Sequence, residues 1–394
     1  AVGVWVATGA RHENMQHNGI SHMVEHMIFK GTPGRTAAQI AEEIENVGGH
    51  INAYTSREVT AYHMHLLKDD LPLALDVLAD ITQRPTMPDD EVERERGVIL
   101  QEIGMTLDTP DDWVFDLYQE AAYPGQALGA PILGTPDIIG AMTRDNLISY
   151  VHGSYTPDRL VVSAAGNLDH DDVVKQVEKL FCDLPAAQPF ETAAASYQGG
   201  EVRTEKPLEQ AHIVLGFEGL SRHDDDFYAA IVLSMIMGGG MSSRLFQEVR
   251  EKRGLVYSVF SFHSPYQDSG QFSIYAGTGP NRLAELVPVL CDEIAKMKQP
   301  VTEEELARAK AQIKSSLVMA QESMLSRTGQ QAKHLIYFDK APDIQEKLAR
   351  IDALNVADIQ KAAARIFSTV PTLSSLGPLA NLESYDSIQK RLAA

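Results

Sequence analysis

The chain has 394 residues, 44% of them hydrophobic and 22% charged, which is the composition of a globular protein with two or more domains. Its net charge of −20 disfavours nucleic-acid phosphate as a partner and favours cationic ligands, although solubility alone also accounts for it. No apolar run reaches the roughly 18 residues that a membrane span needs.

The charge is uneven, and cysteine is scarce. Residues 1–190 carry 29 acidic and 12 basic side chains, a balance of −17, whereas the rest of the chain has a balance of −3. The two cysteines, Cys182 and Cys291, lie far apart, which disfavours a disulfide framework and the cysteine-based zinc patterns.

The first predicted element is a strand in AVGVWVATGA. Because its alternating pattern is present from the first residue, we expect the natural N-terminus to lie upstream. A helix that Gly31 closes follows, and Thr36 is a suitable N-cap for the next one. Alternation and β-branched residues then indicate two strands joined by a turn at 56–58. The expected helices cover residues 20–30, 36–47, 71–83, 88–107 and 169–181, and a further strand covers 159–167.

Periodicity is lost in PAAQPFETAAASYQGGEVRTEK, residues 185–206, which we interpret as a linker. The order helix, glycine, strand, turn, strand occurs on both sides of it, and at an offset of 205 Gly49 corresponds to Gly254. We therefore predict an α+β fold of two similar α/β domains related by an internal repeat. The predicted boundaries are 1–187 for a catalytic zinc-binding domain, 188–205 for the linker, and 206–394 for a homologous inactive domain that completes the substrate site.

The segment HMVEHMIFKG, residues 22–31, contains the residue types that a catalytic metal site needs. His22 and His26 are four apart on a helix and can present both imidazoles to one zinc ion. Glu25 lies on nearly the same face, where its carboxylate can act as general base toward a water molecule. The alternative is a buried helix with packed histidines, and the HxxEH order of the inverzincins favours the metal site.

A catalytic zinc site usually has three protein ligands, so a third must come from elsewhere. The helix ERERGVILQEIG offers Glu95 and Glu102, two turns apart on one face. One glutamate can bind zinc, and the other can orient a histidine through its second ring nitrogen.

These residues resemble the pitrilysin and insulinase family of inverzincin metallopeptidases. The resemblance covers essentially the whole chain, through NGISHMVEHMIFKGT, GGHINAYTSRE, ERGVILQEI and LFQEVREKRGLVYSV. It is nearest to the branch of bacterial processing-type peptidases and the mitochondrial processing peptidase β subunit. It implies one Zn²⁺ per chain, with His22, His26 and Glu102 as ligands, Glu25 as base and Glu95 orienting a ligand.

The resemblance also implies substrate-binding residues. Asn52, Ala53, Tyr54 and Thr55 match an edge strand that binds the substrate backbone, although an ordinary amphipathic strand has the same pattern. Arg250 and Tyr257 match a pair that completes the site, Tyr257 donating to the oxyanion. Asp112 and Asp116 match acidic positions that receive a substrate arginine, and a solvated acidic face is the alternative.

The sequence thus predicts a zinc endopeptidase or oligopeptidase that cleaves extended peptides or unstructured N-terminal segments, with a preference for basic residues near the scissile bond. The alternatives are a non-catalytic structural subunit of the same fold, as in respiratory-complex core proteins, and a peptide-binding protein whose zinc is only structural. We expect a homodimer, with a heterodimer with a related chain as a second option. We expect a bacterial cytoplasmic location; the mitochondrial matrix and periplasm stay open, because we expect the natural N-terminus to lie upstream.

Overall fold

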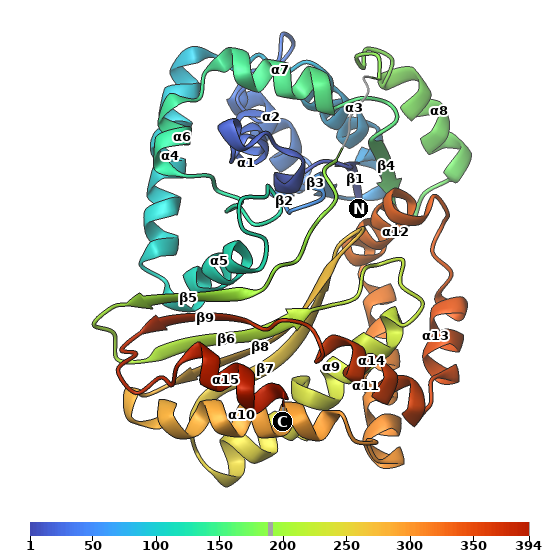
Figure 1. The fold of residues 1–394 in the computed structure, drawn as a ribbon. Coiled ribbons are helices and arrows are strands. Elements are labelled where there is room, and N and C mark those ends of the chain that lie inside the picture. The colour runs from blue at the N-terminus through green and yellow to red at the C-terminus, as the bar shows by residue number, and fades with distance from the viewer. Residues whose placement is uncertain (188–191, 394) are drawn as a thin grey trace. The chain divides into compact units, whose positions relative to one another are not determined.

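The computed structural model describes residues 1–187 and 192–393, which form two compact units (Figure 1). The first unit comprises Ala1–Met105, Gln126–Ala193 and Met319–Pro342. The second comprises Thr106–Gly125, Ala194–Val318 and Asp343–Ala394. Each unit therefore contains one segment that the predicted boundaries assign to the other half of the chain. The division at 188–205 stays a prediction about domains, and residues 188–191 of that linker lie outside the described residues.

The first unit contains an antiparallel sheet in the order β2-β3-β1-β4. Its strands are β1 Val2–Val6, β2 His50–Thr55, β3 Thr60–His65 and β4 Leu160–Ala164. The hairpin β2–β3 pairs Thr55 with Thr60, so the two strands and the short turn predicted there are confirmed. β2 is an edge strand, with β3 as its only strand partner in the described part of the chain.

Helices cover both faces of this sheet. One face is buried in the core with α1 and α3, where Val4, Tyr62 and Met64 are inaccessible to solvent. On the other face Trp5 and Ala61 pack with Ala332 of α12. The helices are α1 Ile20–Met27, α2 Ala37–Glu45, α3 Leu71–Gln83, α4 Asp89–Leu107, α6 Pro136–Ala141, α7 Arg144–Ser154, α8 His170–Leu180 and α12 Met324–Phe338.

The second unit contains a five-stranded sheet in the order β5-β9-β6-β8-β7. Its strands are β5 Gly200–Glu205, β6 Ala211–Glu218, β7 Val256–Pro265, β8 Gly270–Thr278 and β9 Thr372–Gly377. β5 runs parallel to β9, and the other pairs are antiparallel. β5 lies inside the segment that we interpreted as a linker, so residues 200–205 correct that interpretation.

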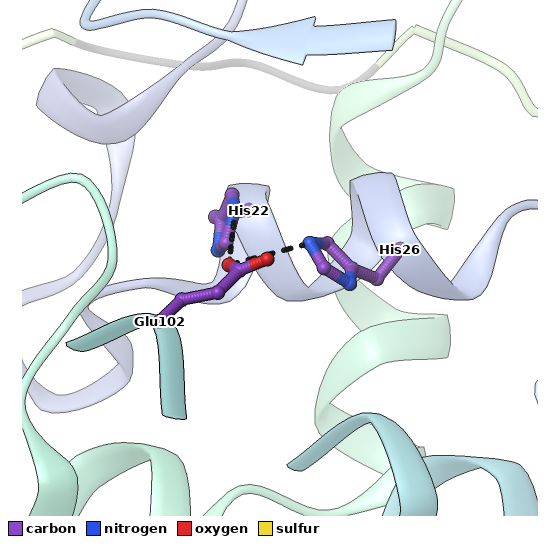
Figure 2. A group of neighbouring side chains, drawn as sticks. All are labelled: His22, His26 and Glu102. Carbon is purple, nitrogen blue, oxygen red and sulfur yellow. Dashed lines mark ion pairs between the residues drawn. The ribbon is translucent and has the colours of Figure 1, made fainter. Parts of the chain in front are cut away.

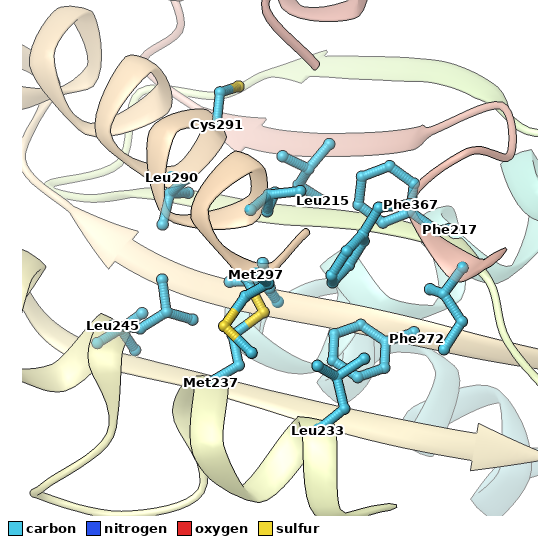
Figure 3. Packing of buried hydrophobic residues seen from close by; sticks show 14 of the residues in the cluster. Leu215, Phe217, Leu233, Met237, Leu245, Phe272, Leu290, Cys291, Met297 and Phe367 are labelled. Carbon is cyan, nitrogen blue, oxygen red and sulfur yellow. The ribbon is translucent and has the colours of Figure 1, made fainter. Parts of the chain in front are cut away.

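The core of the second unit lies between this sheet and its helices, where Leu215, Phe272, Leu233 and Met297 pack together (Figure 3). On the opposite face Val114 and Tyr118 of α5 pack against the sheet. The helices are α5 Pro110–Ala122, α9 Phe227–Gly238, α10 Leu283–Met297, α11 Glu303–Met319, α13 Ile344–Ala353, α14 Val356–Ile366 and α15 Tyr385–Ala393. A π-helix, Phe246–Lys252, precedes β7.

The two sheets repeat one design. Read from the edge, the order β2-β3-β1-β4 of the first corresponds to β7-β8-β6-β9 of the second, to which β5 is added. In both units the edge hairpin follows a helix and a glycine with positive φ, Gly48 in one and Gly254 in the other. The predicted α+β fold with an internal repeat is therefore confirmed.

Candidate metal centre

The helix α1 begins at a point that its neighbours fix. Gly19, its N-cap, has φ of 91°, and a Cβ added there would lie 2.8 Å from Gly134 Cα. The buried carboxylate of Glu13 accepts hydrogen bonds of 2.8 Å from the backbone N–H groups of Gly19 and Ser21. Because a carboxylate at a helix N-terminus satisfies free N–H groups and complements the helix dipole, Glu13 holds the start of α1 in place.

Three side chains from α1 and α4 converge: His22, His26 and Glu102 (Figure 2). Their candidate ligand atoms all lie within 4.8 Å of one another. Glu102 Oε2 is 3.5 Å from His22 Nε2 and 3.7 Å from His26 Nε2. Burial, with His26 close by, lowers the pKa of His22 to about 4, so His22 is neutral at pH 7, the form that binds a metal.

Glu25 lies beside these three residues on α1. Burial raises the pKa of its carboxyl, although the hydrogen bond with Thr55 acts in the opposite direction. Its Oε2 is buried and has no hydrogen-bond partner among the residues of the structure that are described. A carboxylate oxygen left in this state is available to accept a proton from a bound molecule.

Glu95 lies seven residues before Glu102 on α4 and contacts His26. Its Oε2 is 2.9 Å from His26 Nδ1, and its Oε1 is 2.5 Å from Lys30 Nζ. Burial favours a higher pKa for Glu95, but the hydrogen bonds from Lys30 and His26 outweigh burial and hold the pKa below its ordinary value. Because an ionised carboxylate only accepts, His26 Nδ1 carries the hydrogen, which leaves Nε2 available as a ligand.

The residues present fit a zinc ion. Two imidazole nitrogens and one carboxylate oxygen form a donor set that zinc uses, and three protein ligands leave one coordination position for water or substrate. Glu25, whose Oε2 has no partner in the described residues, interacts electrostatically with His26 and Glu102, so its carboxyl is near the ligand cluster. Within residues 1–187 and 192–393, no other group of three His, Cys, Asp or Glu side chains brings its ligand atoms this close.

The predicted substrate strand, β2, lies next to α1. Thr55 Oγ1 donates to Ser21 O at 3.4 Å, so the end of the strand is tied to the start of the helix. Asn52 Oδ1 accepts from Ala53 N at 2.8 Å. Tyr54 OH accepts from the Trp5 indole at 3.1 Å, and Lys333 Nζ lies 5.1 Å from the centre of the Tyr54 ring.

Arg250 and Tyr257 belong to the second unit, where they lie close together. The Arg250 guanidinium is 5.1 Å from the centre of the Tyr257 ring and 4.8 Å from that of Phe246. Arg250 comes from the π-helix, and Tyr257, a residue that is 79% exposed, lies at a bulge between Val256 and Ser258 in β7. Both kinds of irregularity are frequent at functional sites.

Asp112 and Asp116 also belong to the second unit and lie one turn apart on α5. Asp112 is exposed and Asp116 partly buried. The structure thus brings His22, Glu25, His26, Glu95 and Glu102 together within the first unit.

Two residues of the site were not predicted, Glu13 and Lys30. Glu13 lies before the helix, where spacing gives no signal. Lys30 follows His26 by four positions but lies beyond the end of α1 at Met27, so only its contact with Glu95 in the structure reveals it.

The sequence profiles of two family domains match most of the chain. The domain described as insulinase (peptidase family M16) matches residues 1–136, and the peptidase M16 inactive domain matches residues 141–313. The chain belongs to peptidase family M16, the pitrilysin and insulinase family of zinc metallopeptidases, which confirms the resemblance seen in the sequence.

Among curated relatives, a Bacillus subtilis protein named uncharacterized zinc protease YmxG is 41% identical over 98% of this chain and 94% of its own length. A Rickettsia felis protein named uncharacterized zinc protease is 41% identical over 96% of this chain and 92% of its own. A protease of known structure from Helicobacter pylori has 26% identity and a TM-score of 0.88, covering 95% of this chain and 93% of that one.

A chain of the complex III2 structure from Candida albicans has 21% identity and a TM-score of 0.88, over 99% of this chain and 94% of that one, and shares the fold. None of the helices in the described residues is both long and apolar enough to cross a membrane.

Proposed function

We propose that this protein is a zinc-dependent endopeptidase or oligopeptidase that cleaves extended peptides or unstructured N-terminal segments. The observation that carries the proposal is the cluster of His22, His26 and Glu102 with the unpartnered carboxylate oxygen of Glu25 beside it. Relatives that match over nearly the whole chain are named zinc proteases, which supports the same activity.

In this proposal each residue has one task. His22, His26 and Glu102 hold the metal, and Glu95 orients His26. When bound, zinc polarises the scissile carbonyl and lowers the pKa of a water molecule to about 7. Glu25 takes a proton from the attacking water at Oε2 and passes it to the leaving amine, so the carboxylate is regenerated in each turnover.

The substrate is held by β2 in this proposal. An edge strand presents backbone N–H and C=O groups to an added peptide strand, and residues 52–55 lie on such an edge, tied to α1 through Thr55. This mode of binding requires an extended peptide, which excludes a folded segment as the substrate.

Three further roles belong to the proposal. Tyr257 donates a hydrogen bond to the oxyanion, and Arg250 holds a substrate carbonyl. Asp112 and Asp116 pair with a basic residue near the scissile bond. The family resemblance supports these roles, as do the π-helix and the bulge that present the Arg250–Tyr257 pair.

The proposal also covers metal content, assembly and location. We include in the proposal one zinc ion per chain, a homodimer with a heterodimer with a related chain as the second option, and a bacterial cytoplasmic location. Metal content per chain and sedimentation of the purified protein test the first two.

The alternative is a non-catalytic subunit. The likeness to the complex III2 chain is one of fold alone, and a subunit without activity has no need of a general base. This chain has a complete set of three ligands and a base, which favours the enzyme. A purely structural zinc site is closed by four protein ligands, and three lie close together here.

The test combines metal analysis with cleavage of a fluorogenic cationic peptide. Glu25→Gln should keep zinc and lose turnover by about 10²–10⁴-fold, because general-base catalysis supplies this factor. His22→Ala and Glu102→Ala should lose both zinc and turnover. Cleavage by purified Glu25→Gln at the wild-type rate would falsify the mechanism.

A further inference from the structure

Lys30 lies four residues after His26, beyond the end of α1, and binds the carboxylate that in turn binds this histidine. Lys30 Nζ is 2.5 Å from Glu95 Oε1, and Glu95 Oε2 is 2.9 Å from His26 Nδ1. We infer that Lys30 is a positioning residue of the metal centre, whose ammonium group fixes Glu95 and thereby the ring orientation and tautomer of His26. The inference rests on the proposed zinc site.

The backbone around Lys30 is itself fixed, so its side chain starts from a defined point. The N–H of Lys30 donates to Met27 O at 3.1 Å. The next residue, Gly31, has φ of 121°, and its carbonyl accepts hydrogen bonds from both the backbone N–H and the hydroxyl of Thr86, at 3.0 and 2.9 Å. From this turn the Lys30 side chain reaches Glu95.

The contact between Lys30 and Glu95 is largely shielded from water. The Glu95 side chain is 9% exposed and that of Lys30 is 26% exposed. A shielded carboxylate without a cation is costly, so Glu95 without Lys30 gains by turning toward solvent. In doing so it would release His26 Nδ1, and the ring would lose the hydrogen bond that orients it.

The two histidines are held differently, which makes the effect specific. His26 Nδ1 is bonded to Glu95, whereas His22 Nδ1 is buried without a hydrogen-bond partner in the described part of the chain. Lys30 therefore acts on one of the two imidazole ligands, through one carboxylate.

Zinc affinity of the metal-free protein, measured by competition with a chelator, tests the inference without any assay of cleavage. Lys30→Met should weaken zinc binding by about tenfold, because loss of a residue that orients a ligand typically costs 10–100-fold. Lys30→Arg, which keeps the charge, should restore most of the affinity. Lys175→Met is the matched control: Lys175 is 74% exposed in an ion pair of 3.6 Å with Asp172, and its loss should change nothing.

A double-mutant cycle separates positioning from general stability. If Lys30 acts through Glu95, Lys30→Met should have little further effect on zinc affinity in a Glu95→Gln background. Equal effects in both backgrounds, or wild-type affinity of Lys30→Met, would overturn the inference. Thermal unfolding of the metal-free variants shows whether any substitution destabilises the fold.

Two outcomes separate this inference from the proposed function. Full activity of Glu25→Gln would refute the peptidase mechanism but would leave the result of the double-mutant cycle valid. Wild-type zinc affinity of His22→Ala would refute both the zinc site and the inference.

Discussion

Tyr257 is turned outward by the bulge in β7, and the Arg250 guanidinium lies over its ring. A phenol in this position can donate its hydroxyl to a developing oxyanion, where one donor contributes about 10²–10³-fold in kcat. Tyr257→Phe should therefore lower kcat by about 100-fold with zinc content unchanged. Metal analysis and steady-state kinetics on one peptide measure both quantities.

The control for this prediction is Tyr228→Phe. Tyr228 also has an arginine over its ring, Arg350 at 4.7 Å, so the same change removes a hydroxyl from a similar cation–π pair. Its turnover should equal that of the wild type. A Tyr257→Phe enzyme with normal kcat would exclude Tyr257 as the oxyanion donor.

Asp112 and Asp116 allow local pairing to be separated from long-range steering. Asp112→Asn with Asp116→Asn should flatten the preference for arginine at one substrate position and leave cleavage of neutral peptides roughly unchanged. Steering by net charge weakens with salt beyond a Debye length of about 8–10 Å, whereas a desolvated pair is less sensitive. A peptide library cleaved at low and high salt distinguishes the two.

The matched control removes the same charge from the same region. Asp108→Asn with Asp111→Asn changes the net charge equally at two exposed positions. It should weaken any steering to the same extent and keep the arginine preference. If the wild type and both double mutants had identical cleavage profiles, the acidic side chains would contribute to solubility alone.

The residues of the candidate zinc site could be predicted from sequence to different degrees. His22, Glu25 and His26 follow from helical spacing, because residues four apart share a face. Spacing also selected Glu95 and Glu102 but did not decide which of them is the candidate ligand. Lys30 was not predicted, because a lysine near the end of a helix is usually a solvated cation, and only its contact with Glu95 distinguishes it.

At the scale of elements, the first turn of α11 is fixed by an ion pair. The Arg244 guanidinium donates to Glu305 through two bonds of 2.7 and 2.9 Å, and Glu305 Oε2 also accepts from Thr302 N at 2.8 Å. The Arg244 hydrogen bonds are the main cause that lowers the pKa of Glu305 to about 2. A lowered pKa stabilises the fold above the unfolded value near 4.5, and this stability is lost as the pH falls toward 2.

Glu305→Gln should accordingly lower the free energy of unfolding by about 2 kcal/mol at pH 7, a value that allows for screening by solvent. The difference from the wild type should shrink between pH 4.5 and 2, because the wild-type carboxylate then takes up a proton. Urea unfolding at pH 7 and pH 3 measures this. The neighbouring Glu304→Gln, at an exposed position of the same turn, should have little effect. A difference that stayed constant with pH would contradict the role of the ion pair.

Elements whose signals are local could be predicted well. The helix expected at 71–83 has these bounds in the structure, and Thr36 caps α2 as expected. β5 was missed because its partner β9 is parallel and about 170 residues later, so its short alternation lay hidden in a Gly- and Ala-rich segment. The order helix, glycine, strand indicates a helix before β7, but a hydrophobic pattern does not reveal that its hydrogen bonding is that of a π-helix.

For the whole molecule, the main feature is that each unit includes a helix from the other half of the chain. α12 covers Trp5 and Ala61 in the first unit, and α5 covers Val214 and Tyr275 in the second. Amphipathic periodicity predicts that such helices are covered on one face but not which sheet they cover. Fragments 1–187 and 188–394, each expressed alone, should therefore be poorly soluble, and their co-expression should yield folded protein.

A peptide provides the control for this prediction. A synthetic peptide of residues 319–342 should stabilise fragment 1–187, because it supplies the missing helix. The same peptide with Ala332→Asp should not, since Ala332 is fully buried in this contact. If either fragment alone were soluble with a cooperative unfolding transition, the two halves would be independent domains.

The exchange of helices also determines when each unit can finish folding during synthesis. The sheet of the first unit is complete once Ala164 has been made, but the helix that covers its outer face ends at Phe338. At typical translation rates this interval lasts roughly 9–35 s. For that time the nascent chain presents the apolar surface around Trp5 and Ala61 to the ribosome exit site and to other nascent chains. The yield of folded protein should then depend on the speed of translation and on chaperones that bind this surface, more than on the stability of the finished fold.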